Sequence, residues 1–548
     1  MKKSPYFLWQ TDSAPAKLGF AESDCVLVLE GTAKAYTVTE PDDKAARVAA
    51  DQFTEHIYKM TGCRLPDSPF EGGTPVYIGR AAELDLPDTE GFALAVGKDA
   101  VYAAGNDNDP FTGTAFAVTA MLEALGFGWF GPEELWQKVP QNKTAVLPAV
   151  NMISRPHFIS RRNRVLEQQY ELGVHWGLGG VRSEIEHKYG HFFPPHVYEQ
   201  THPEYYALSN GTRATKDKKW WELCLSNEEV QKGMARQVCE FFREHPEWHG
   251  YSIGQNDGNG IKDSIDYANW CECEECRKFA PTFSDAVLRF SNKVASLVYE
   301  EFPEHTLMFY GYFGTYPAPT VPCPEPISPN LQLTLCKECG FTGKIRTDEA
   351  CSDAEHPPFA ENYRRWKETG LEHIAIYEWN CPGAANPAWK EAFWVQGEVG
   401  FDNLKWFYEN GVDFVYFDQG PNDSYERRNN AFPIRWPQWY CMAHACYNTS
   451  LKFDDVLLDA CEKLYGNASS LMFEFYKSME QANAHCHYPH FNWGLPLVGE
   501  IYDDEFIERV EKAICAAENA DGICKLQRER IAQQRSEWEK TKNMAKIQ

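Results

Sequence analysis

The alternation of apolar and polar positions in the first 150 residues predicts a small α/β unit. Apolar runs at residues 25–30 and 76–79 have the length and composition of strands. Residues 92–96 and 101–104 flank a glycine-containing turn and predict a hairpin. Between the first two runs, apolar side chains recur at helical spacing over residues 43–60. Together these elements predict an N-terminal α/β accessory domain.

From residue 151 to about residue 430, strand-like runs alternate with helical patterns such as residues 284–301. The alternation predicts an α/β fold with a (β/α)8 TIM-like barrel as its central domain. One strand of the eight is expected near residues 174–180. The other seven strand candidates are residues 158–162, 221–225, 250–254, 306–310, 331–335, 373–377 and 414–417.

Beyond residue 431 the pattern becomes helical. Apolar side chains recur at helical spacing in residues 453–465, 469–484 and 503–548. This part is expected to form a C-terminal helical domain. The predicted domains are therefore residues 1–150, 151–430 and 431–548.

Charge and hydropathy exclude two classes of partner. The chain has 53 basic and 79 acidic side chains, a net charge of −26. Nucleic acids and anionic membrane surfaces attract basic proteins, so neither is expected as a partner. No run of about 18 apolar residues occurs, so no membrane span is expected. The start as given lacks a signal segment, which indicates a cytoplasmic protein, or a secreted or periplasmic one if a signal was removed.

Carboxylates and aromatic residues follow the predicted barrel strands, at the end where such barrels carry their active sites. Several carboxylates at one mouth, beside aromatic rings, suit glycoside hydrolysis, which needs a proton donor and a second group for the transition state. Each of them could instead cap a helix or pair with a cation. These residues are Gln255, Asn256, Asp257, Tyr310, Tyr312, Glu338, Glu378, Trp379 and Asp418.

The adjacent pair Asn256-Asp257 indicates a mechanism in which the substrate takes part. A 2-acetamido sugar can use its own amide oxygen as nucleophile, so the enzyme needs one group to orient the amide and one acid for the leaving group. An Asn can orient and a carboxylic acid can protonate. The same pair is also common in turns. His191, in a predicted loop, could contact a sugar hydroxyl or simply face solvent.

Cys271, Cys273 and Cys276 form a C-x-C-x2-C cluster. A structural zinc ion needs four ligands in tetrahedral geometry, and the fourth would come from Cys336, Cys339 or a histidine. Free or disulfide-bonded thiols are the alternative. Glycoside hydrolysis itself requires no cofactor.

Several stretches resemble a known family. They include residues 190–195 with 202–208, residues 223–227, 252–257 and 335–339, the cysteine cluster and residues 417–420. The chain resembles the DUF4838 proteins, part of which is classified as glycoside hydrolase family 163, the endo-β-N-acetylglucosaminidases. The matches cover most of residues 150–480. Two departures concern the expected site: Asp418 stands where the family usually has Glu, and residues 258–270 form a longer segment.

The resemblance implies a retaining, substrate-assisted endo-β-N-acetylglucosaminidase that cleaves the chitobiose core of N-glycans, on an oligosaccharide or a glycoprotein. It implies Glu338 or Asp257 as general acid/base, and Asn256 or Asp257 as the group that holds the acetamido substituent. Sugar subsites would be lined by His191, Gln255, Tyr310, Tyr312, Glu378, Trp379 and Asp418.

Three alternatives remain open at this point. An exo-acting glycosidase of the hexosaminidase or α-glucuronidase type would use two carboxylates directly, and for a uronic acid it would need a basic residue. A non-catalytic glycan-binding protein would bind sugar without turnover. A zinc-dependent enzyme would lose activity with a chelator. The sequence does not predict the oligomeric state.

Overall fold

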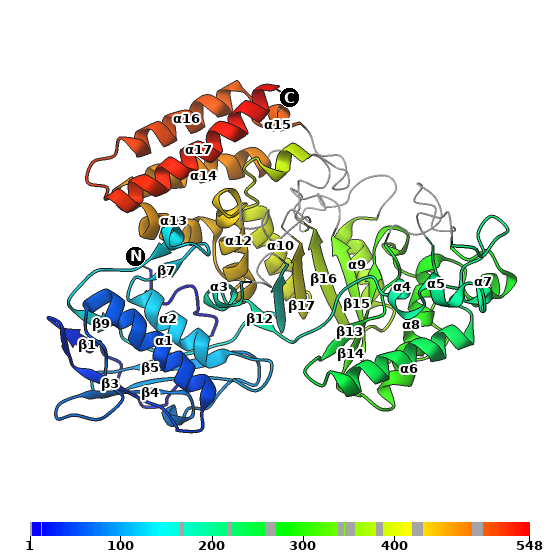
Figure 1. Ribbon diagram of the computed structural model, residues 1–548, viewed down its shortest axis with the longest axis horizontal. Helices are drawn as coiled ribbons and strands as arrows, with labels where there is room; N and C mark the ends of the chain where they lie inside the picture. Colours follow the sequence, from blue (N-terminus) through cyan, green and yellow to red (C-terminus); the bar gives the residue numbers. More distant parts are fainter. Residues whose placement is uncertain are drawn as a thin grey trace.

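The computed structural model describes residues 3–12, 14–164, 169–215, 221–257, 270–337, 345, 357–379, 387–418, 431–484 and 497–547. Figure 1 shows an N-terminal α/β unit in blue and cyan, a curled sheet of parallel strands, and C-terminal helices in orange and red. Within the described residues, no helix is both long enough and apolar enough to cross a membrane.

The N-terminal unit contains a five-stranded sheet in the order β10-β5-β6-β4-β3. The predicted hairpin is confirmed as the antiparallel pair β5–β6. The predicted helix is confirmed as α1, which begins after Asp43, whose side chain accepts the Ala46 N–H, and ends at Gly62 with φ of 75°. The elements are β3 (Ala35–Val38), α1 (Lys44–Thr61), β4 (Thr74–Ile78), β5 (Phe92–Val96), β6 (Val101–Gly105), α2 (Gly113–Ala124) and β10 (Val150–Ser154), beside a small sheet of β1 (Cys25–Leu29), β2 (Thr32–Ala33) and β9 (Ala145–Leu147).

The central sheet has the strand order β12-β11-β17-β16-β15-β14-β13. Every neighbouring pair from β11 to β13 is parallel, and only the short β12 runs antiparallel. This curled parallel sheet is typical of a TIM barrel and confirms the predicted fold class. Its strands are β11 (Ser160–Asn163), β12 (Gly179–Gly180), β13 (Gly250–Ser252), β14 (Thr306–Gly311), β15 (Leu331–Lys337), β16 (His373–Trp379) and β17 (Phe414–Asp418).

Helices connect the parallel strands. Asn227 caps α6 and Thr282 caps α8, each by accepting backbone N–H groups of the first turn. The helices α6 and α8 pack against each other beside β13 and β14 (Figure 1). The connecting helices are α6 (Glu228–Glu244), α8 (Phe283–Tyr299), α9 (Phe359–Lys367) and α10 (Glu398–Glu409).

Of the strands expected in the central domain, one is wrong and one is confirmed only in part. Residues 221–225 form no strand of the sheet, because their backbone pairs with a loop: Ala207 donates to the Glu222 carbonyl and Cys224 to the Tyr205 carbonyl. The strand expected near residues 174–180 is present as the two-residue β12, antiparallel to β11 at the edge of the sheet, and it follows the end of α3 (Tyr170–His175). The position beside β13 is taken instead by residues 183–187, through bridges from Ser183 to Gly250 and from His187 to Gly254.

The C-terminal helices confirm the predicted helical region. Every residue of α12 is buried, and it joins the units: the Tyr447 hydroxyl lies 3.0 Å from the Ser154 hydroxyl of the N-terminal sheet, and α12 contacts β11. The predicted helix over residues 503–548 is two helices separated by a turn. The helices are α12 (Phe432–Tyr447), α13 (Phe453–Tyr465), α14 (Ser469–Ala484), α15 (Val498–Ile501), α16 (Asp504–Glu518) and α17 (Lys525–Ile547).

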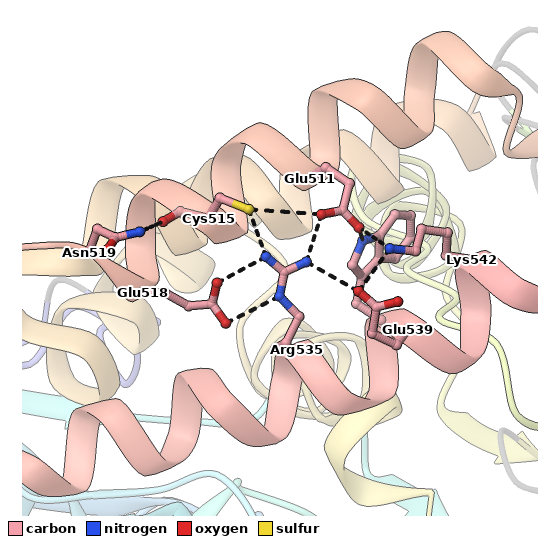
Figure 2. A network of polar contacts seen from close by, with 8 residues as sticks. Glu511, Cys515, Glu518, Asn519, Arg535, Glu539 and Lys542 are labelled. Atoms are coloured by element: carbon pink, nitrogen blue, oxygen red, sulfur yellow. Dashed lines mark hydrogen bonds and ion pairs between the residues drawn. The ribbon is translucent and has the colours of Figure 1, made fainter.

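Helices α16 and α17 are linked by a network of charged side chains (Figure 2). Arg535 of α17 pairs with Glu511 at 2.7 Å and with Glu518 at 2.9 Å, both on α16. Lys542 contacts the other oxygen of Glu511 at 2.5 Å. Because several partners share each charge, this network holds the two helices together better than an isolated surface pair would.

Candidate active site

A pocket of about 360 Å³ lies at the carboxyl ends of the parallel strands. Residues two apart on a strand face the same side, so Tyr310 and Tyr312 at the end of β14 both reach it. Of the residues expected from the sequence, it brings together Asp257, Tyr310, Tyr312 and Asp418. Its described lining is Arg164, Ile185, Glu186, His187, Asp257, Tyr310, Tyr312, Cys336, Tyr377 and Asp418.

Asp257 follows β13 and presents a carboxylate that is 54% exposed. Tyr312 donates its hydroxyl to Asp257 Oδ1 at 2.9 Å. His187 Nε2 lies 3.9 Å from the same oxygen, and its Nδ1 lies 2.5 Å from the Gln255 carbonyl, which fixes the ring. The carboxylate is therefore oriented by the Tyr312 hydroxyl, lies near the His187 ring and is still reachable by a ligand.

Asp418, at the end of β17, is the second carboxylate of the pocket and is buried. Its Oδ2 accepts the Tyr377 hydroxyl at 2.8 Å and pairs with Arg164 Nη1 at 3.2 Å. Burial, and then the charge of Asp418, raise the pKa of Tyr377 well above its usual value, so its hydroxyl stays protonated and donates.

Gln255 is fully buried and does not line the pocket. Its amide nitrogen donates to the Tyr310 carbonyl at 2.9 Å and lies 2.7 Å from the Thr315 hydroxyl. Because these contacts join the end of β13 to the end of β14, Gln255 positions the two strand ends that carry Asp257 and Tyr312.

Asn256 also turns away from the pocket. Its carboxamide accepts the Gly190 N–H at 3.1 Å and donates to the Trp221 carbonyl at 2.7 Å. Its own backbone N–H lies 3.4 Å from Glu222 Oε2, on a buried side chain. Burial raises the pKa of Glu222 well above its usual value; the hydrogen bond from the Asn256 N–H opposes this rise, and the nearby charge of Asp257 adds to it. Asn256 thus joins three segments behind the pocket wall.

Glu378 lies on the opposite face of its strand from the pocket-lining Tyr377, because neighbouring strand residues face opposite sides. It is buried against Lys337, its cross-strand partner on β15, with Nζ 3.6 Å from Oε2. His191 is exposed on the short helix α4 (Tyr189–Phe192) and is not part of the described lining. Trp379 ends β16, and Glu338 lies outside the described residues.

Sequence reasoning missed several lining residues. The sequence analysis selected Glu378 on this strand, whereas the side chain that lines the pocket is that of the preceding residue, Tyr377. Arg164 directly follows β11, and His187 belongs to the segment that bridges to β13. Strand alternation could have found Tyr377, but His187 had no signal because its segment showed no strand pattern.

Four cysteine sulfurs come together at the end of the residue 221–224 segment. Those of Cys224, Cys271, Cys273 and Cys276 all lie within 4.8 Å of one another. The expectation of Cys336 as the fourth member is wrong, because Cys336 lines the pocket; Cys339 lies outside the described residues. This donor set could bind a structural zinc ion.

A second pocket, of about 420 Å³, lies between the N-terminal unit and β11 and β12. The one carboxylate in its described lining is Glu90, which is buried in an ion pair with Arg161 and accepts the Thr112 hydroxyl at 3.0 Å. Since that carboxylate is fully engaged, this pocket is less suited to acid–base chemistry than the first.

Comparison with known proteins gives one family match. A family model described as a domain of unknown function, DUF4838, matches residues 132–477. A search of curated proteins finds no match.

Three solved structures in which the chain follows a similar course are hexosaminidases. A β-hexosaminidase of Streptomyces plicatus is 12% identical, covers 87% of this chain and 95% of its own, and has a TM-score of 0.43. The β-N-acetylhexosaminidase of Bacteroides fragilis is 11% identical, with 85% and 95% coverage and a TM-score of 0.46. That of Streptomyces coelicolor is 13% identical, with 85% and 96% coverage and a TM-score of 0.43. Because these identities and TM-scores are low, the fold assignment rests on the strand order of the central sheet and not on these structures.

Proposed function

The chain belongs to the DUF4838 family, and we propose that it is a glycoside hydrolase acting on glycans that contain N-acetylglucosamine. One observation carries the proposal: Asp257 and Asp418 line the same pocket, and each accepts a hydroxyl from a tyrosine of that pocket. Two oriented carboxylates among aromatic rings, at the carboxyl ends of barrel strands, suit the cleavage of a glycosidic bond.

We assign Asp257 to the substrate's acetamido group. An exposed carboxylate beside Tyr312 can accept the amide N–H, which makes the amide oxygen a better nucleophile. That oxygen bonds to the anomeric carbon while the glycosidic C–O bond breaks, and the leaving oxygen takes a proton from the general acid. Water then adds to the anomeric carbon, its proton returns to the acid, and the acetamido group is restored.

Glu338 is the proposed general acid. It comes two residues after Cys336, which lines the pocket, and Asp257 is already held by a hydroxyl donor and faces His187. A carboxylate that already accepts a hydroxyl from the protein suits the orienting role better than that of a proton donor. Asp418, which pairs with Arg164, is proposed to bind a sugar hydroxyl.

The finer proposal is an endo-acting enzyme that cleaves the chitobiose core of N-glycans, as the resemblance to glycoside hydrolase family 163 implies. A glycoprotein with complex N-glycans is incubated with wild type, and mass spectrometry identifies the products. We expect free glycan ending in one N-acetylglucosamine and a protein that keeps the other. Release of single sugars only would contradict endo action, and no release at all would contradict hydrolysis of this substrate class.

Leaving-group dependence separates the two carboxyl roles. Glu338→Gln should lose most activity on the glycan but much less on a nitrophenyl glycoside, whose leaving group needs little protonation. Asp257→Asn should lose activity on both. Glu186→Gln is the matched control, because Glu186 lines the same pocket with a mostly exposed carboxylate. If Glu338→Gln lost the same fraction of activity on the glycan and on the nitrophenyl glycoside, Glu338 would not be the general acid.

A uronic acid exo-glycosidase is the second candidate, because Arg164 places a cation in the pocket. That guanidinium already pairs with Asp418, which favours a positioning role. Hydrolysis of nitrophenyl α-glucuronide, lost in Arg164→Met, would establish this alternative over the first.

A further inference from the structure

We infer that Cys224, Cys271, Cys273 and Cys276 bind one zinc ion, and that this ion holds the pocket wall carrying Asp257. Four thiolates at about 2.3 Å from a central zinc lie roughly 3.8 Å apart, the edge of the tetrahedron. The Cys224 sulfur lies 3.7, 3.6 and 3.9 Å from those of Cys273, Cys276 and Cys271, and Cys271 lies 3.4 Å from Cys273.

The spacing favours one ion over disulfides. A disulfide joins two sulfurs at about 2.05 Å and excludes the others from that distance. Here the Cys224 sulfur is nearly equidistant from three partners, as expected around a common centre. All four lie within 4.8 Å, a separation suited to a single ion.

The surroundings supply donors that thiolate ligands need. The Leu208 N–H points to the Cys271 sulfur at 3.3 Å and the Cys276 N–H to the Cys273 sulfur at 3.4 Å. The Ser226 hydroxyl lies 3.1 Å from the Cys276 sulfur. Such donors orient metal ligands and spread their charge.

A cation also lies beside the cluster. The Arg213 guanidinium interacts electrostatically with the sulfurs of Cys224 and Cys273. Four thiolates around a divalent ion leave two negative charges, which one guanidinium partly offsets.

The cluster is connected to the pocket wall through Asn256. Cys224 ends the segment that contains Trp221 and Glu222. The Asn256 carboxamide donates to the Trp221 carbonyl, and the Asn256 backbone N–H points to the Glu222 carboxylate. Asn256 immediately precedes Asp257. The segment that carries Cys271 and Cys273 is joined to the loop of residues 205–208, because Glu272 donates its N–H to the Leu208 carbonyl. The same loop pairs with the segment that ends at Cys224. An ion with four thiolates has no open position for substrate, so its role is structural.

Metal analysis tests the site without any glycan substrate. We expect one zinc per wild-type chain, none in Cys224→Ser or Cys271→Ser, and full zinc in Cys239→Ser, a buried cysteine outside the cluster. A wild-type protein without metal, whose four thiols are all alkylated in the native state, would overturn the inference. Iron in place of zinc would overturn the identity of the ion.

A second measurement covers variants that fail to fold. Wild type exchanged into cobalt should show the intense near-ultraviolet absorption of cobalt–thiolate bonds, and Arg213→Gln should weaken zinc binding about 10–100-fold. Absence of the thiolate band would count against the site. The coupling of the zinc site to Asp257 rests on the proposed function, and it predicts that zinc removal lowers kcat. The metal content is measured without any enzyme activity. If the wild type contains zinc but its kcat does not change when the zinc is removed, the zinc site stands and its coupling to Asp257 is overturned.

Discussion

The Tyr312 hydroxyl donates to Asp257 Oδ1 across 2.9 Å, joining the ends of the adjacent strands β14 and β13. Removing that donor should leave the carboxylate less firmly oriented. We predict that Tyr312→Phe lowers kcat/KM about 10–100-fold, the value of one hydrogen bond to a charged group, mostly in kcat. Steady-state kinetics on the glycan measure this. Tyr299→Phe, on the exposed face of α8, is the control, and an unchanged kcat would show that Tyr312 takes no part.

Asn256 allows two roles to be separated. The sequence suggested a substrate contact, whereas the structure shows its carboxamide bonded to the Gly190 N–H and the Trp221 carbonyl. Asn256→Ala leaves both groups without that partner, and we predict a loss of about 1–3 kcal/mol in unfolding free energy together with lower activity. Chemical denaturation measures the stability. A variant with wild-type stability and no activity would instead establish a substrate contact.

The ion pair of Arg161 with Glu90 lies between the N-terminal unit and the central sheet, with side chains 0% and 1% exposed. Glu90→Gln removes the counter-charge and leaves a buried guanidinium. We predict a loss of about 3–5 kcal/mol, seen as a lower denaturation midpoint. Asp42→Asn breaks the exposed pair with Arg80, side chains 80% and 58% exposed, and should leave the denaturation midpoint almost unchanged. Equal effects would contradict the importance of burial.

The parallel sheet and the helical tail could be predicted because their patterns are local. Apolar runs such as Leu331–Lys337 and the spacing in α8 are visible in any short window. The wrong strand at residues 221–225 has the same local pattern, but its backbone pairs with residues 205–207, a contact that only the folded chain creates. Tertiary contacts decide between such alternatives.

The site was predictable only in part for a related reason. Position at a strand end identified Asp257 and Asp418, whereas facing direction decided that Glu378 pairs with Lys337 outside the pocket. The fourth cysteine, Cys224, is far from the other three in sequence, so no spacing rule could connect it to them. Long-range convergence is the information that a linear motif lacks.

Glu511 predicts how the C-terminal helices respond to acid. Burial opposes its ionisation, but hydrogen bonds from Lys542, Arg535 and Trp538 lower the pKa of Glu511 to about 2 (Figure 2). An unfolded Glu titrates near 4.3, so this group stabilises the fold above that pH and the contribution is lost as the pH falls toward 2.

We therefore predict that Glu511→Gln lowers the stability at pH 7 by about 1–2 kcal/mol, allowing for solvent screening of a partly exposed network. At pH 3 the difference between variant and wild type should be smaller, because the wild-type carboxylate has lost most of its advantage over the unfolded state. Thermal unfolding at the two pH values measures it. Glu505→Gln, an acidic position of the first turn of α16 outside this network, is the control. If the stability difference between Glu511→Gln and wild type is the same at both pH values, Glu511 acts through packing and hydrogen bonds that do not depend on its charge. An effect of the charge must follow the titration of the carboxyl group.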